Sequence, residues 1–231
     1  MDIAILQDHG SFLFRWIHFL AGITWIGVLY YFNFMQAPFF AETDPDVKKA
    51  CTQKLVPRAL WWFRWGAMLT FITGWSIILI YIFPKGGSWT DSYMAKIMPG
   101  ALMGTFMWFN VWFIIWPAQK LAIAAANGET PDPHLADKVR RAFLASRTNT
   151  LLSVGLLFFM AAARHLAISP ASTLTWYAIV GGIVLVIEIN ALTAKKGVTT
   201  APIEKTSGVI ISGIVLAFIE YGILEALKSS A

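Results

Sequence analysis

Long runs of apolar residues recur along the chain, and most charged residues gather in the short segments between them. A helix needs about 20 mostly apolar residues to cross the hydrocarbon core of a bilayer. Six runs come close to this length, at about 12–35, 66–83, 98–116, 144–168, 174–192 and 209–227. The pattern therefore predicts an all-α integral membrane protein, a bundle of six transmembrane helices that form a single domain over residues 1–231.

Proline or glycine follows most of these runs. Pro38 follows the first, Pro84 the second, Pro117 the third, Pro170 the fourth and Gly197 the fifth. Proline removes a backbone donor and glycine frees φ, so we expect the helices to end at these positions. Because few residues separate the fourth and fifth runs, these two helices should form an antiparallel hairpin.

The composition agrees with a lipid environment. Apolar residues make up 57% of the chain and charged residues only 13%, whereas about 25% of the residues in a soluble domain are charged. This excludes a soluble globular protein. The single cysteine, Cys51, excludes an intrachain disulfide, a CxxC zinc site and covalently attached c-type haem. Sequence signatures of phosphate loops and hydrolases are also absent.

The net charge of +5 comes from basic residues that are spread between the apolar runs, which does not indicate a nucleic-acid-binding face. Most of the 18 Lys and Arg residues lie in the first, third and fifth connections. The positive-inside rule makes that side cytoplasmic. We therefore expect a multi-pass protein of the bacterial inner (cytoplasmic) membrane with both termini on the outer, periplasmic side.

Two histidines lie within apolar runs, His18 in the first and His165 near the end of the fourth. The predicted orientation places both on the outer side of the membrane. Gly22 lies four residues after His18 and leaves room for a flat macrocycle. We therefore predict haem b with His18 and His165 as axial ligands, and with Arg15 and Arg164 pairing with its propionates.

A structural interpretation of the same residues is open. Small residues in membrane helices usually serve helix packing, as we expect for Gly100 and Gly104. An arginine near the end of a span usually extends to the headgroups, and a histidine there can be a polar interface residue. His9 can substitute for one of the ligands, whereas His134 is expected to be solvated.

Two glutamates also lie within apolar runs, Glu188 in the fifth and Glu220 in the sixth. We expect each to hydrogen-bond a neighbouring helix in its protonated form; a place on a proton path is the alternative. Candidate polar partners within the spans are Asn33, Asn110 and Asn190.

Several short motifs occur in a fixed order: residues 15–27 of the first run, 62–65 with 73–75, 110–120, 131–133 and 146–165. In this order they resemble the membrane domain of bacterial membrane-bound urate hydroxylase, the urate oxidase N-terminal domain family. The resemblance covers about residues 12–168, and two further helices occupy 172–228.

The resemblance implies a membrane oxidoreductase that passes electrons to cytochrome c, in full-length members through a fused C-terminal cytochrome domain. This chain contains no CxxCH motif, so we expect any c-type cytochrome to be a separate protein. It also has Thr148 where the family tends to place a histidine, which puts urate chemistry in doubt.

The first hypothesis is therefore a membrane redox subunit that binds haem b and exchanges electrons with a c-type cytochrome or with a larger membrane complex. A haem-free accessory subunit of such a complex is the alternative, and a urate-oxidising membrane enzyme is a further one. No residue is assigned as catalytic.

Overall fold

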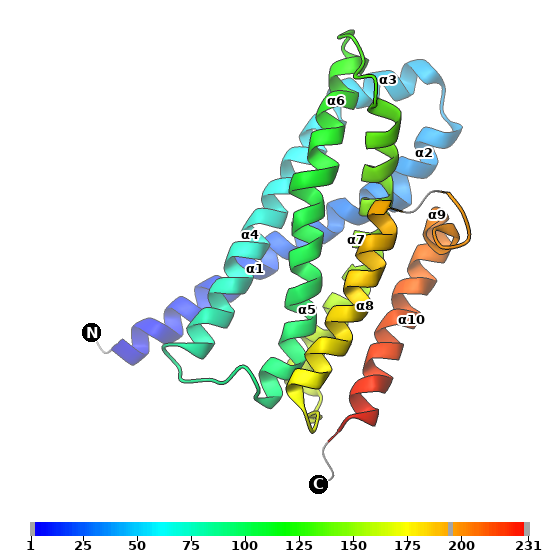
Figure 1. Ribbon diagram of the computed structural model, residues 1–231. Helices are drawn as coiled ribbons and strands as arrows, with labels where there is room; N and C mark the ends of the chain where they lie inside the picture. Colours follow the sequence, from blue (N-terminus) through cyan, green and yellow to red (C-terminus); the bar gives the residue numbers. More distant parts are fainter. Residues whose placement is uncertain (1–2, 194–195, 229–231) are drawn as a thin grey trace.

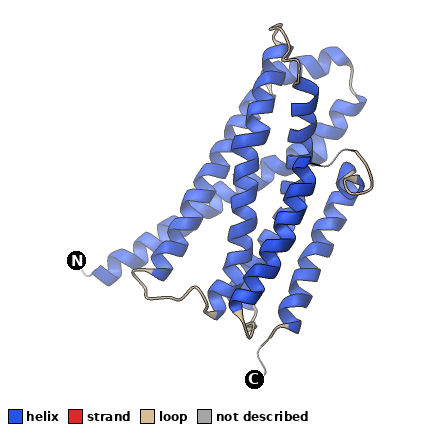
Figure 2. Ribbon diagram, in the orientation of Figure 1, coloured by secondary structure: helices blue, strands red, loops and turns tan. Residues whose placement is uncertain are grey.

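The computed structural model describes residues 3–193 and 196–228, and within them the chain is almost entirely helical (Figures 1 and 2). Six helical segments are long and apolar enough to cross a membrane. The all-α class and the six predicted spans are thus confirmed.

The first span is a continuous run of α1 (Ile3–Tyr30), the π-helical segment η1 (Tyr31–Gln36) and α2 (Ala37–Glu42). The third is built in the same way from α5 (Ser92–Phe109), η2 (Asn110–Ile115) and α6 (Trp116–Ala126). The other elements are α3 (Pro45–Lys54), α4 (Val56–Ile82), α7 (Leu135–His165), α8 (Thr173–Thr193), α9 (Ala201–Glu204) and α10 (Thr206–Ala226).

The prediction that Pro38 and Pro117 end their helices is wrong, because both helices continue through the proline. A π-helical segment precedes each one. Ala37, just before Pro38, donates its N–H to Phe32, five residues back, and Trp116, just before Pro117, donates to Val111 in the same way. The wider π-helical turn gives the proline ring room and tolerates its missing N–H donor, so the helix continues.

Helix α7 lies at the centre of the bundle. It packs against α5, η2, α6, α8 and α10, and 61% of its most apolar stretch is buried, against 17–33% in the other spans. Its buried face carries polar side chains, among them Thr148, Asn149 and Ser153. A helix surrounded by other helices can present such groups to protein partners instead of to lipid.

Helix α1 packs mainly along α4. At Gly66 the two backbones approach so closely that an added Cβ would lie 3.1 Å from the backbone nitrogen of Trp25. Helix α1 reaches α7 only near its own end, where Tyr30 and Ser153 share a hydrogen bond of 2.9 Å. In Figure 1 the N-terminal half of α1 lies with α4, away from α8 and α10.

Helix α1 begins and α10 ends at the same end of the bundle, whereas α3 and the α6–α7 connection lie at the other end (Figure 1). The first and third connections, both rich in Lys and Arg, therefore share one end, as the charge pattern requires. Helices α7 and α8 form the expected antiparallel hairpin.

Candidate functional site

His18 lies on the face of α1 that meets α4 and is partly buried. Its Nδ1 atom is 3.1 Å from the hydroxyl oxygen of Thr73. Its ring also lies close to the Gly74 backbone, since a Cβ added there would lie 3.0 Å from His18 Cε1. Gly74 thus provides the space that the imidazole occupies.

The Thr73 hydroxyl also lies 2.6 Å from the backbone oxygen of Leu69 and 3.3 Å from that of Thr70. A hydroxyl that donates its one proton to either of these oxygens accepts from His18 Nδ1–H. In that tautomer the lone pair of the neutral ring is on Nε2. In a metal-ligating histidine, one ring nitrogen usually donates a hydrogen bond to a second group, and the other nitrogen uses its lone pair to bind the metal.

The other predicted residues of the first helix lie near His18. Arg15 is one turn before it on α1 and half exposed. Gly22 is one turn after it, and a Cβ added there would meet Thr70 of α4 only at 3.9 Å. Gly22 therefore lies at an ordinary packing distance from α4, and the tight glycine beside His18 is Gly74.

His165 is the last residue of α7 and is exposed. Its neighbour Arg164 places its guanidinium over the ring of Tyr93, 4.8 Å from the ring centre. Both residues therefore lie at the end of the bundle where α5 begins and α7 ends.

His18 and His165 have different surroundings. His18 is partly buried against α4, whereas His165 is the exposed last residue of α7. A buried cluster that includes Ile78 of α4, Met94 of α5 and Ala163 of α7 joins these three helices. One haem with two axial imidazoles needs them on opposite sides of a single iron, so joint ligation by the two histidines stays a prediction, and each is considered below as a separate candidate.

A buried polar network lies in the middle of the bundle. Asn110 Nδ2 donates to Asn149 Oδ1 at 2.9 Å and to Glu188 Oε2 at 3.1 Å, and Asn149 Nδ2 donates to the backbone oxygen of Met107 at 3.0 Å. This confirms that Glu188 hydrogen-bonds a neighbouring helix. Asn33 instead bonds Ser146 of α7, and Asn190 bonds the backbone oxygen of Thr199.

Glu220 has a different environment. Its side chain is fully buried, and neither carboxyl oxygen has a hydrogen-bond partner. It lies against α7, where a Cβ added at Gly155 would be 3.4 Å from Glu220 Oε2. The hydrogen bond to a neighbouring helix that we expected for this residue is therefore not formed.

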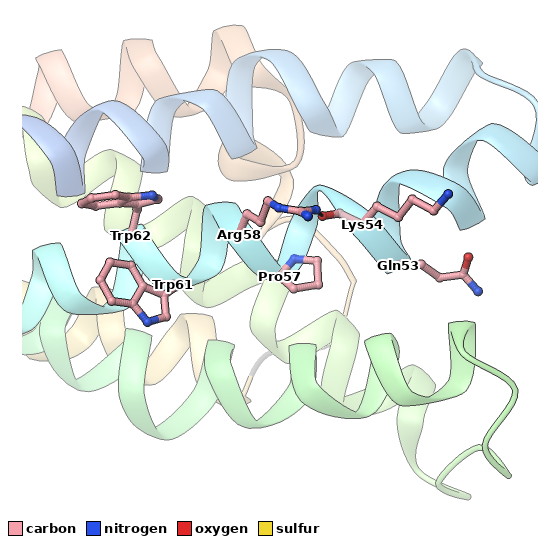
Figure 3. Close-up of a pocket in the computed structure, with 6 residues that line it drawn as sticks. All are labelled: Gln53, Lys54, Pro57, Arg58, Trp61 and Trp62. Carbon is pink, nitrogen blue, oxygen red and sulfur yellow. Dashed lines mark hydrogen bonds between the residues drawn. The ribbon is translucent and has the colours of Figure 1, made fainter.

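The structure contains two cavities near the end of the bundle that holds the first and third connections. The first, of about 580 Å³, lies along α3 and the start of α4 (Figure 3). It is lined by Gln53, Lys54, Pro57, Arg58, Trp61 and Trp62. Basic and tryptophan side chains together are typical of the level of the lipid headgroups.

The second cavity, of about 360 Å³, is a groove between α8 and α10 above α7, which we call the α8–α10 groove. Its lining includes the hydroxyl-bearing residues Thr148 and Ser212 among apolar side chains. Thr148 is fully buried and its hydroxyl has no hydrogen-bond partner. In the part of the chain that the structure describes, no group of three His, Cys, Asp or Glu side chains could hold a metal ion.

Sequence reasoning missed Thr73, which orients His18, and the Asn110–Asn149 bond that holds Glu188. Each joins residues at least 39 positions apart. The only signal available was a polar residue in an apolar run, which gives no information about which helices become neighbours.

Comparison with known proteins agrees with this architecture. The family model described as urate oxidase N-terminal matches residues 89–220, from the connection before α5 to Glu220 in α10. No curated protein matches the chain, and no solved structure matches it. The matched region covers more than half of the chain and contains the buried polar network and both buried glutamates. The chain belongs to the urate oxidase N-terminal family.

Proposed function

We propose that this chain is a redox subunit of the bacterial inner membrane that exchanges electrons with a c-type cytochrome or a partner complex on the periplasmic side. In this proposal His18 is its ligand to haem b. The observation that carries the proposal is the hydrogen bond between His18 Nδ1 and Thr73. In the tautomer that donates from Nδ1, Nε2 is the nitrogen with a lone pair.

The neighbours of His18 support this role. Thr73 orients the ring, Gly74 gives it room, and Arg15 lies one turn away as a cation for a propionate. Haem in such a position supplies one-electron transfer, with a potential set by its ligands and by its burial. Because His165 is the exposed last residue of α7, His18 is the axial ligand that we assign to this chain first.

The test is an absorption spectrum of the purified chain together with its pyridine haemochrome. We expect a Soret band and a b-type haemochrome, both unchanged in His165→Ala. Protein that is intact by mass but shows no haem absorbance would exclude haem binding. A spectrum lost in His165→Ala but kept in His18→Ala would reverse the ligand assignment.

A haem-free accessory subunit is the second candidate. The exposure of His165 favours it, as does the absence of His18 from the lining of either cavity. Such a subunit would co-purify with a larger membrane complex, carry no chromophore and tolerate substitution of both histidines.

Membership of the urate oxidase N-terminal family supports a third candidate, a urate-oxidising enzyme. Addition of urate to membranes that contain the chain would then reduce cytochrome c. No reduction above that of membranes without the chain would exclude this activity.

A further inference from the structure

Glu220 is an ionisable group in the interior of the bundle. It is fully buried, and both of its carboxyl oxygens lack a hydrogen-bond partner. A Cβ added at Gly155 of α7 would lie within 3.4 Å of both Glu220 and Met103 of α5, and neither Gly155 nor Met103 is charged. A carboxylate without a cation or hydrogen bonds is costly in such surroundings, so Glu220 needs a proton, or water, to be stable there.

Glu188, the other buried glutamate, is partly satisfied by hydrogen bonds. Its Oε2 accepts from Asn110, while its Oε1 and the Oδ1 of Asn110 have no partner. Both unpartnered atoms are acceptors, and in Asn149, the next member of the network, the amide oxygen and the amide nitrogen are both engaged. A donor must come either from a proton on Glu188 or from water.

The α8–α10 groove runs along the helices that carry these carboxyls. Leu216 lines the groove one turn before Glu220 on α10, and Leu151 lines it one turn before Gly155 on α7. Ile187, next to Glu188 in the sequence, lines it from α8. The groove therefore extends along these helices toward α9, and neither carboxyl is part of its lining.

An independent observation inside the groove points to a polar occupant. Thr148 is one of the residues that line the groove, and its buried hydroxyl has no hydrogen-bond partner. An unpaired buried hydroxyl is stabilised by a water molecule that bridges it to other polar groups. Thr148 is also adjacent to Asn149, so water bound there would lie beside the network that holds Glu188.

We propose that Glu220, together with Glu188, forms a proton-exchange site in the bundle core that is reached by water through the α8–α10 groove. A hydronium ion transfers its proton to a carboxylate oxygen, which leaves a neutral carboxylic acid and a water molecule; release is the reverse. The inference goes beyond the proposed redox function and requires no haem.

The charged groups near the ends of this route are few. Arg147 of α7 is buried at the α9 end, where its guanidinium donates to Thr206 at 3.3 Å. Glu225 lies on α10 beyond Glu220, and it accepts from Tyr221 and Lys228. None of these hydrogen bonds involves Glu220. We therefore expect the protonation of Glu220 to depend on protons that arrive through the groove and not on an ion pair with a charged neighbour.

Infrared spectroscopy of the purified full chain in lipid nanodiscs tests the proposal. We expect a carbonyl stretching band of buried carboxylic acid that shifts to lower frequency when H₂O is replaced by D₂O. Glu220→Gln should remove part of this band and Glu188→Gln another part. Glu225→Gln, on the same helix but at an exposed ion pair, is the matched control and should leave the band unchanged.

A groove-filling variant, Ser212→Trp, tests the route. The band should remain, but its shift in D₂O should be slower, because the indole ring occupies the groove. Labelling with a lipid-soluble carbodiimide, mapped by mass spectrometry, provides a measurement on the unsubstituted chain and should modify Glu220.

Three results would overturn the inference. The first is a band that never shifts in D₂O, which would show a permanently isolated, purely structural carboxyl. The second is the absence of both the band and the carbodiimide adduct. The third is exchange in Ser212→Trp at the unsubstituted rate. None of these outcomes affects the haem spectrum, so this inference and the proposed function fail separately.

Discussion

Thr73 is the hydrogen-bond partner of the His18 ring. When Thr73 donates its only proton to the backbone oxygen of Leu69, it accepts from the imidazole, and the lone pair is then on Nε2. The sequence identified His18 through its position in an apolar run, but Thr73 is 55 residues away. Its role depends on the packing of α1 against α4, which apolar periodicity does not encode.

Substitution of Thr73 by valine tests this orientation. Valine keeps the shape of the side chain but cannot accept from His18 Nδ1. Loss of such an outer partner typically weakens metal binding about 10- to 100-fold, so we expect lower haem occupancy and a shifted reduction potential. Ser76→Ala, one turn away on α4, is the control. An unchanged potential and occupancy in Thr73→Val would show that the hydrogen bond has no such role.

At the scale of the elements, the helix boundaries were the least predictable feature. Apolar periodicity located all six spans, yet Pro38 and Pro117 gave false ends because π-helical turns before them carry the helix onward. Each π segment also contains a buried asparagine, Asn33 and Asn110, that bonds α7. These bonds between distant helices form only in the assembled bundle, so no local rule predicts them.

Because α1 lies so close to α4, we expect a methyl group added at Gly66 to destabilise the fold. In Gly66→Ala the added Cβ would meet the backbone of Trp25 at 3.1 Å, and backbone cannot move aside as a side chain can. We expect destabilisation by about 1–3 kcal/mol, the usual range for an overpacked contact, seen as a lower melting temperature. Gly27→Ala, where nothing lies within 4 Å, should be neutral or stabilising.

Helix α9 is attached to α7 by an ion pair. Arg140 Nη1 donates to Glu204 Oε2 at 2.9 Å, and Nη2 donates to the other carboxyl oxygen. The hydrogen bond from Arg140 lowers the pKa of Glu204 below its ordinary value. The stability that it contributes is therefore complete above the unfolded-state pKa of about 4.5 and is lost as the pH falls through the lower folded value.

Thermal unfolding of Glu204→Gln measures this contribution. The variant should melt below the unsubstituted chain at neutral pH and at the same temperature once Glu204 is protonated in the folded state. Because the pair is partly exposed to solvent, the difference at neutral pH should be under about 1 kcal/mol. A difference that persists unchanged in acid would assign the effect to packing instead.

At the scale of the whole molecule, the distribution of charge along the chain predicts on which side of the membrane a residue lies. It does not predict which helices are its neighbours. Counting Lys and Arg assigned His18 and His165 to the same side of the membrane, but one belongs to the α1–α4 pair and the other to the end of α7. Which helices become neighbours is determined by packing, as at Gly66, and the charges of the loops do not predict it. The fold class followed from composition, whereas the geometry of the site did not.

Orientation in the membrane is a separate prediction. In a Cys51→Ser background, Ser88→Cys in the α4–α5 connection should react with a membrane-impermeant maleimide added to intact spheroplasts. Glu129→Cys in the α6–α7 connection should react only after the membrane is opened. The reverse pattern would place both termini in the cytoplasm and His18 on the inner side.

The most direct test of the haem proposal is the haem-to-protein ratio of the purified chain and of its His18→Ala variant, with folding checked by gel filtration and helical circular dichroism. We predict stoichiometric b-type haem in the unsubstituted chain and its loss in a folded His18→Ala protein, with His165→Ala unchanged. Equal haem content in the unsubstituted chain and in His18→Ala, or no haem in either, would contradict the assignment of His18 as a haem ligand.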